Sequence, residues 1–278
     1  MLMLLAAIVS TPAPLPLARD GTAMVADPCP PPAAPNPGLA ALVTRLLAPG
    51  TAFAPPPVPP RDQPLTGQAA RDWPGLCRYR AENAALSGPV RVVFMGDSIS
   101  ELWKAADPDL FTHGVLDRGI SGQTSAQMLL RFQADVIALH PRAVHILAGT
   151  NDVAGNTGPT TEQAYKDNIV AMATLARANG IRVILGAMPP AGAFWWAPAM
   201  KPAARIVALN RWLADYARFN GFGFVDYHTP LATPDGALDP RFANDGVHPN
   251  STGYAVMRAR LAPMLARYLT ISSKGVRR

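Results

Sequence analysis

The segment Val90-Arg-Val-Val-Phe-Met-Gly-Asp-Ser98 decides the fold. Its first six residues are mostly β-branched and apolar, a pattern that predicts a strand buried on both faces of a parallel sheet. Ser98 follows the carboxyl end of that strand, where open α/β sheets bind their ligands. A serine in such a turn can also act only as the N-cap of the next helix, so this segment alone leaves both roles open.

The chain after this segment repeats the order of strand followed by helix. Strands are predicted at 115–117, 143–148, 182–187 and 222–227, and helices at 125–139, 161–179, 202–220 and 251–269. Asn179-Gly180 and Asn220-Gly221 are typical helix C-caps that come just before the next strand. The alternation predicts an α/β fold, a three-layer α/β/α sandwich with a mostly parallel, flavodoxin-like central sheet.

A later segment, Asp245-Gly-Val-His248, offers the partners that a nucleophilic serine needs. A serine hydroxyl is a poor nucleophile until a base removes its proton, and the base needs an orienting carboxylate. Asp245 and His248 can point out of one tight turn, which leaves the second ring nitrogen of His248 facing Ser98. The same spacing taken alone is more often an ordinary surface loop.

Two further segments supply candidate hydrogen-bond donors for the oxyanion of a tetrahedral intermediate. They are Ser121-Gly-Gln-Thr124 and Gly149-Thr-Asn-Asp152, each after a predicted strand. The candidate donors are the backbone N–H groups of Ser98 and Gly122 and the side-chain amide of Asn151. Either of these segments taken singly could be only a turn.

These four segments, in this order, resemble the SGNH (GDSL-type) serine hydrolases, and most of all the platelet-activating-factor acetylhydrolase catalytic subunits and their bacterial relatives. The resemblance covers most of the chain after its first third. It implies an SGNH-type fold and an ester hydrolase without a cofactor. It also implies that Ser98 is the nucleophile, His248 the general base and Asp245 its partner, and that Ser98, Gly122 and Asn151 form the oxyanion hole.

The resemblance favours small substrates. It implies short-chain, acetyl-type acyl esters, including acetylated carbohydrate, cleaved through an acyl-serine intermediate. The alternatives are an acyltransferase or acetylesterase acting on cell-envelope or plant polysaccharide, and a non-catalytic carbohydrate-binding module that kept the fold. Phe194, Trp195 and Trp196 follow a predicted strand and are expected either to line the substrate pocket or to pack against the sheet edge.

The first third of the chain differs in composition. Residues 1–64 hold 16 of the 30 prolines, a density that predicts neither helix nor central strand. The apolar run at 1–9 is too short to span a bilayer and has the length of a signal-peptide core. We therefore expect a signal peptide at 1–23, a proline-rich segment at 24–87, the hydrolase domain at 88–270 and a basic tail at 271–278.

Cysteine content and charge limit the other classes. Cys29 and Cys77 would form a disulfide in an exported protein or remain as two thiols otherwise. The formal net charge is +6, but no basic stripe with interleaved aromatic residues points to nucleic acid. No Cys/His cluster has metal-ligand spacing. We expect an exported enzyme with no metal and no stable membrane anchor, and the oligomeric state stays open.

Overall fold

The computed structural model describes residues 24–25, 27–31, 36–57 and 65–269. The predicted signal peptide at 1–23 and the predicted basic tail at 271–278 lie outside the described residues. The chain divides into two compact units, Met1–Ala34 and Pro35–Arg278. The fold described below is that of the second unit.

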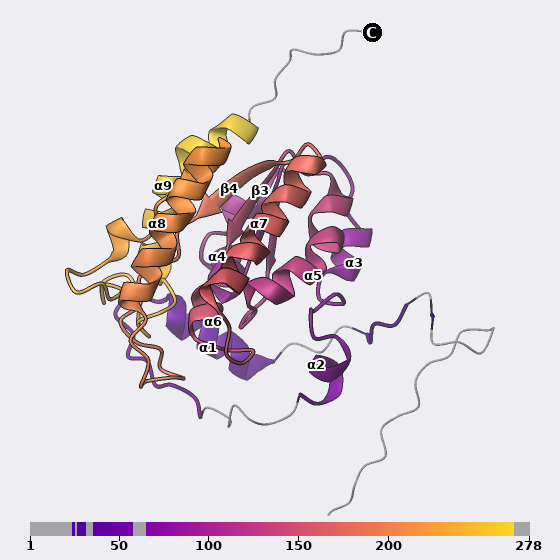
Figure 1. Ribbon diagram of the computed structural model, residues 1–278. Coiled ribbons are helices and arrows are strands. Elements are labelled where there is room, and N and C mark those ends of the chain that lie inside the picture. The colour runs from indigo at the N-terminus through magenta and orange to yellow at the C-terminus, as the bar shows by residue number, and fades with distance from the viewer. Residues whose placement is uncertain (1–23, 26, 32–35, 58–64, 270–278) are drawn as a thin grey trace, which may run out of the picture. The chain divides into compact units, whose positions relative to one another are not determined.

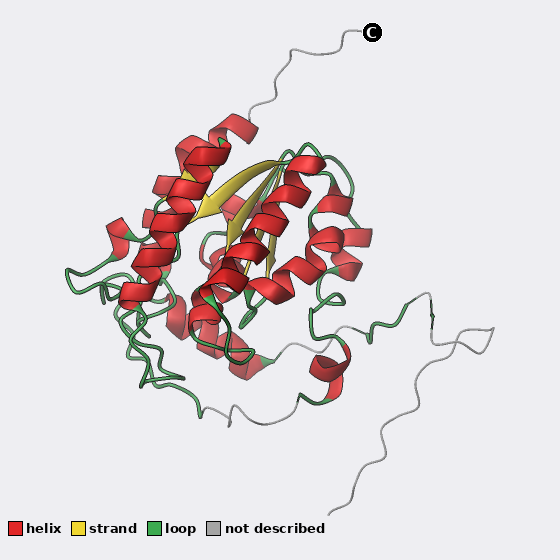
Figure 2. Ribbon diagram, in the orientation of Figure 1, coloured by secondary structure: helices red, strands yellow, loops and turns green. Residues whose placement is uncertain are grey.

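Five parallel strands form the central sheet in the order β2-β1-β3-β4-β5. Figure 2 shows the strands as yellow arrows among the red helices. They are β1 (Val92–Gly96), β2 (Val115–Gly119), β3 (Ala143–Leu147), β4 (Arg182–Gly186) and β5 (Gly223–Val225). This is the flavodoxin-like order. The chain adds β2 on one side of β1 and the later strands on the other side, so a crevice opens between the carboxyl ends of β1 and β3. The predicted three-layer α/β/α fold with a parallel sheet is confirmed.

Helices cover both faces of the sheet (Figure 1). One face packs against α5 (Ser125–Asp135), α7 (Glu162–Ala178) and α8 (Ala203–Asn220), and the other against α1 (Pro37–Leu47), α4 (Ser98–Ala106) and α9 (Ser251–Leu269). Along β1, Val93 and Met95 belong to the first core and Val92 and Phe94 to the second, because successive side chains of a strand alternate between faces. Burial on both sides explains why the sequence of β1 is continuously apolar.

The shorter elements connect these layers. They are the helices α2 (Gly67–Arg71), α3 (Arg80–Ala84) and α6 (Thr150–Val153), and the 3₁₀ turns η1 (Pro108–Phe111), η2 (Ile137–Leu139) and η3 (Thr229–Leu231). The helix that we predicted at 125–139 ends at Asp135, and η2 completes the segment. His140 then adopts a left-handed conformation with φ of 48°, which closes the turn before β3.

The prediction that the proline-rich first third contains no helix is wrong for α1. Its prolines flank the helix instead of interrupting it, and Pro37 stands at the first position, where a missing N–H costs no hydrogen bond. The Asn36 side chain caps the helix by accepting the N–H groups of Gly38 and Leu39 at 2.9 and 3.2 Å. Leu46 is buried in the core beneath α4 and α9. The expected division between residues 87 and 88 does not coincide with a boundary between the compact units.

Both cysteines are disulfide-bonded, and no cysteine is free. The disulfide form that we expected of an exported protein is therefore the one present, in place of two thiols. Of the helices that the structure describes, none has the length and apolar character needed to cross a bilayer.

Candidate active site

Ser98 is the first residue of α4 and lies two residues beyond the end of β1. Asp97 caps the helix, since its Oδ1 accepts the N–H of Ile99 at 2.9 Å. Gly96 makes the sharp turn possible, because a Cβ at this position would lie 2.0 Å from Ser100 Oγ. The strand-to-helix junction therefore fixes Ser98 at the carboxyl edge of the sheet.

The structure brings Asp245 and His248 to Ser98 from the loop before α9. Ser98 Oγ lies 2.8 Å from His248 Nε2, and His248 Nδ1 lies 2.6 Å from Asp245 Oδ2. The other carboxylate oxygen, Oδ1, accepts the backbone N–H groups of Val247 at 2.9 Å and His248 at 2.7 Å. Because a carboxylate only accepts, Nδ1 carries a hydrogen and Nε2 is left to accept the hydroxyl proton of Ser98.

The charges around Ser98, His248 and Asp245 favour a histidine base that works near neutral pH. Burial lowers the pKa of His248, but the Asp245 charge, its hydrogen bond and the Asp97 charge outweigh burial, so the net pKa is raised. Burial raises the pKa of Asp245, but His248 and two backbone N–H groups outweigh it, so the net pKa is lowered. Burial raises the pKa of Asp97 to about 6. Asp245 therefore stays ionised while His248 titrates.

The three expected oxyanion donors lie around the same cavity. The N–H of Ser98 belongs to the first turn of α4, where helical N–H groups have no intrahelical partner. Gly122 has a φ of 81°, which disfavours other residues, and a Cβ there would face open space. Asn151 Nδ2 donates to the carbonyl oxygen of Gln123 at 3.0 Å and to Asp97 Oδ2 at 3.3 Å. An oxyanion at Asn151 would compete with the longer contact to Asp97.

Asn156 is a residue of this site that our sequence analysis missed. Its Nδ2 donates to Asn151 Oδ1 at 2.6 Å, and its Oδ1 accepts from Trp196 Nε1 at 2.9 Å. These bonds fix which way the Asn151 carboxamide is turned. Nothing in the spacing of the sequence marks Asn156, because its contact with Trp196 joins distant segments of the chain.

A cavity of about 470 Å³ adjoins Ser98 and His248. Trp195 and Trp196 line it, and Trp196 lies with its ring centroid 6.4 Å from that of His248. Phe194 does not line the cavity, which corrects our expectation for this residue. Its side chain is fully buried in the core and stacks on Trp196 from below, with ring centroids 5.1 Å apart.

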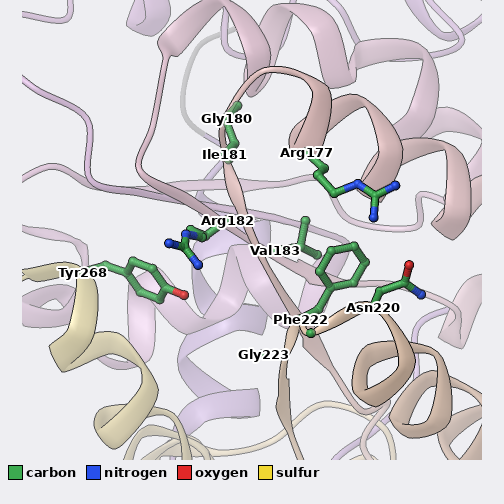
Figure 3. Close-up of a pocket in the computed structure, with 10 residues that line it drawn as sticks. Arg177, Gly180, Ile181, Arg182, Val183, Asn220, Phe222, Gly223 and Tyr268 are labelled. Carbon is green, nitrogen blue, oxygen red and sulfur yellow. The ribbon is translucent and has the colours of Figure 1, made fainter.

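A second depression lies at the amino ends of the strands β4 and β5, and Figure 3 shows the residues that line it. Its volume is about 290 Å³, and its lining includes Arg182 at the start of β4, Gly223 at the start of β5 and Tyr268 of α9. Ligands of parallel α/β sheets bind at the carboxyl ends of the strands. The depression at the amino ends is therefore not the candidate active site.

Two conspicuous residues outside this cavity are structural. Trp103 is fully buried, as expected for a core residue. His145 is also fully buried on β3, where burial lowers its pKa to about 3 and its Nε2 lies 2.9 Å from the Tyr227 hydroxyl. It is therefore neutral at physiological pH. Within the described ranges, no group of three or more His, Cys, Asp or Glu side chains is placed to hold a metal ion.

Comparison with known proteins gives matches over the same region. Residues 94–256 match the model of the GDSL-like Lipase/Acylhydrolase family. A provisionally named acylhydrolase from Bacteroides fragilis is 46% identical with a TM-score of 0.69, over 72% of this chain and 99% of that chain. A GDSL-like lipase from Bacteroides thetaiotaomicron is also 46% identical with a TM-score of 0.68, over 70% of this chain and 98% of that chain.

The match to a curated protein is shorter. The lipoprotein YqeF of Bacillus subtilis, itself uncharacterized, is 38% identical over 74 residues. These residues are 26% of this chain and 30% of the length of the lipoprotein.

Proposed function

This chain belongs to the GDSL-like lipase/acylhydrolase family, and we propose that it hydrolyses carboxylic esters through an acyl intermediate on Ser98. The observation that carries the proposal is the hydrogen-bonded row from Ser98 Oγ through the His248 ring to the Asp245 carboxylate. This row supplies a nucleophile, a base and an orienting group at one end of a cavity.

In the first half of the proposed reaction, Ser98 Oγ attacks the carbonyl carbon of the ester while His248 Nε2 takes the hydroxyl proton. The carbonyl oxygen becomes an oxyanion, and donors at Ser98, Gly122 and Asn151 stabilise it. Asp245 stays ionised and stabilises the imidazolium. The bond to the alcohol oxygen then breaks, and His248 returns the proton to that oxygen.

In the second half, a water molecule attacks the acyl carbon while His248 accepts one of its protons. The second tetrahedral intermediate uses the same oxyanion donors. The bond to Ser98 Oγ breaks as His248 returns the proton to the serine, which releases a carboxylic acid. A sugar hydroxyl in place of water would make the enzyme an acyltransferase, which product analysis with an acceptor sugar detects.

The test is Ser98→Ala, assayed with p-nitrophenyl acetate. We expect a loss of about 10⁴-fold or more in kcat, because the triad loses its nucleophile. Ser100→Ala is the matched control, since Ser100 is the neighbouring serine on α4 but is fully buried. We expect it to retain activity. A Ser98→Ala enzyme within tenfold of the wild type contradicts the proposal.

We also propose that the protein is exported. Support comes from the apolar run at 1–9, from the disulfide-bonded state of Cys29 and Cys77, and from the lipoprotein name of the Bacillus subtilis relative. N-terminal sequencing of protein from an exporting host should give a mature end between Thr22 and Asp27. An intact Met1 would contradict export.

A further inference from the structure

The cavity at Ser98 has two walls of different chemistry. The polar wall includes Ser98, Gly122, Asn151 and His248, and the polar residues Glu101, Ser121, Asn156 and Asp245 also line the cavity. The apolar wall includes Leu39, Leu42, Val43 and Leu46 of α1, together with Phe53 and Leu102. A substrate held against Ser98 therefore has hydrocarbon on its other side.

The apolar wall starts beside the nucleophile. Ser98, Leu102 and Ala105 are spaced by four and three residues on α4, so they share one face of that helix, and all three line the cavity. A chain attached to Ser98 Oγ would run along this face beneath α1. Each fully buried CH₂ group is favourable by an amount equivalent to roughly fourfold in binding.

The C-terminal end of helix α1 is hydrogen-bonded to the loop before α9, which carries Asp245 and His248. Asn244 Nδ2 lies 2.8, 3.0 and 2.7 Å from the carbonyl oxygens of Arg45, Leu46 and Ala48. Carbonyl groups in the last turn of a helix have no intrahelical partner, so Asn244 satisfies the end of α1. Asn244 directly precedes Asp245 in the chain. The residue that holds α1 is therefore the neighbour of the residue whose carboxylate orients His248.

The far side of the wall is joined to the loop between β4 and α8. The rings of Phe53 and Trp195 lie with their centroids 5.7 Å apart. The cavity between these elements, about 470 Å³, falls within the range of about 300–1,000 Å³ typical of small-molecule sites. Its lining contains no lysine or arginine that would pair with an anionic headgroup. The chemistry fits a neutral ester with a hydrocarbon chain.

We propose that α1 forms one wall of an acyl-chain pocket and that the enzyme prefers medium-length acyl esters, such as octanoates, to acetate esters. This inference rests on the proposed ester hydrolysis, and it departs from the short-chain preference that we expected from the sequence. Helix α1 lies before the region matched by the family model, which begins at residue 94. The acyl chain is the occupant because it stays bonded to Ser98 through both halves of the reaction.

The experiment measures kcat/KM for p-nitrophenyl acetate, butyrate and octanoate with the full chain. We expect the wild type to favour octanoate over acetate by about tenfold or more, since six further CH₂ groups enter the pocket. Leu42→Trp, which fills the pocket, should lower this ratio at least about tenfold. Ala41→Trp is the matched control, because Ala41 is exposed on the same helix and does not line the cavity. It should leave the ratio unchanged.

Two further variants keep the test decisive. If thermal unfolding shows that Leu42→Trp is not folded, Leu42→Ala replaces it and should lower the ratio through lost contact. Asn244→Ala should also lower the ratio, because it releases the end of α1 without replacing any residue that lines the cavity.

The outcomes separate this inference from the proposed function. Suppose that acetate hydrolysis depends on Ser98. An octanoate-to-acetate ratio of kcat/KM near one in the wild type then overturns the acyl pocket alone. Equal ratios in Leu42→Trp and Ala41→Trp do the same. The acyl pocket is also overturned if kcat/KM is higher for octyl acetate than for ethyl acetate but does not change with the length of the acyl group. An absence of Ser98-dependent hydrolysis of every ester overturns the proposed function.

Discussion

The polar wall of the cavity comes from the carboxyl ends of β1, β2 and β3 and from the loop before α9, whereas the apolar wall depends on α1, which precedes the sheet in the chain. In the polar wall, hydrogen bonds from neighbouring groups hold Asn151, His248 and Asp245 in place. The apolar wall is held by packing and by hydrogen bonds from the Asn244 side chain. We infer that the first sets the rate for every ester and the second selects among esters.

The largest effect that we expect is from Asp245→Asn on the polar wall. An asparagine can offer an N–H to Nδ1, which stabilises the wrong tautomer of His248, so kcat should fall about 10⁴-fold. Measured with p-nitrophenyl acetate and octanoate, the loss should be equal for both esters. A loss of kcat for octanoate alone would contradict the inference that the polar wall acts on every ester equally.

Asn151→Ala should lower kcat by roughly 10² to 10³-fold with little change in KM, because its donor matters most when the oxyanion forms. Steady-state kinetics on both esters measure this split. Asn151→Asp serves as a control that keeps the size of the side chain but removes the donor. A change in KM alone would make Asn151 a binding contact.

Asn156→Ala should lower kcat about fivefold, because the Asn151 carboxamide loses the hydrogen bond that orients it and such a bond contributes about 1 kcal/mol. Trp196→Phe removes the N–H that orients Asn156 but keeps an aromatic ring, so its effect on kcat should be smaller. If the variant loses thermal stability and its kcat falls only in proportion to the unfolded fraction, Asn156 supports only the fold.

The smallest expected effect is on the pH profile. His248 must be neutral to accept the Ser98 proton, so activity should rise with pH and then level off. Because its pKa is raised, the midpoint of the rise should lie above the ordinary histidine value of 6.5. Asp97→Asn keeps a helix cap but removes a charge that raises this pKa, so the midpoint should move to lower pH. A profile of kcat/KM that is flat from about pH 5 to 9 would exclude His248 as the base.

Most of the sheet and the polar wall could be predicted because their determinants are local. The run from Val92 to Gly96 is apolar on both faces, and the break in pattern at Asp97 places Ser98 at the strand end. Local geometry also links Asp245 to His248 within one turn. Asn156 and Asn244 could not be found in this way, since Trp196 orients Asn156 and Asn244 bonds to α1, and in both cases the partner lies in a distant segment.

The sequence by itself determined the order of strands and helices, the parallel sheet and the residues gathered at its carboxyl edge, because apolar periodicity and turn residues act over short stretches of chain. Only the tertiary structure decided that 37–47 is a helix packed against the core, that Phe194 lies beneath Trp196 and that Leu42 faces the cavity. These features depend on which distant surfaces meet. The free energy that stabilises them comes from burying apolar side chains against partners far away in the sequence.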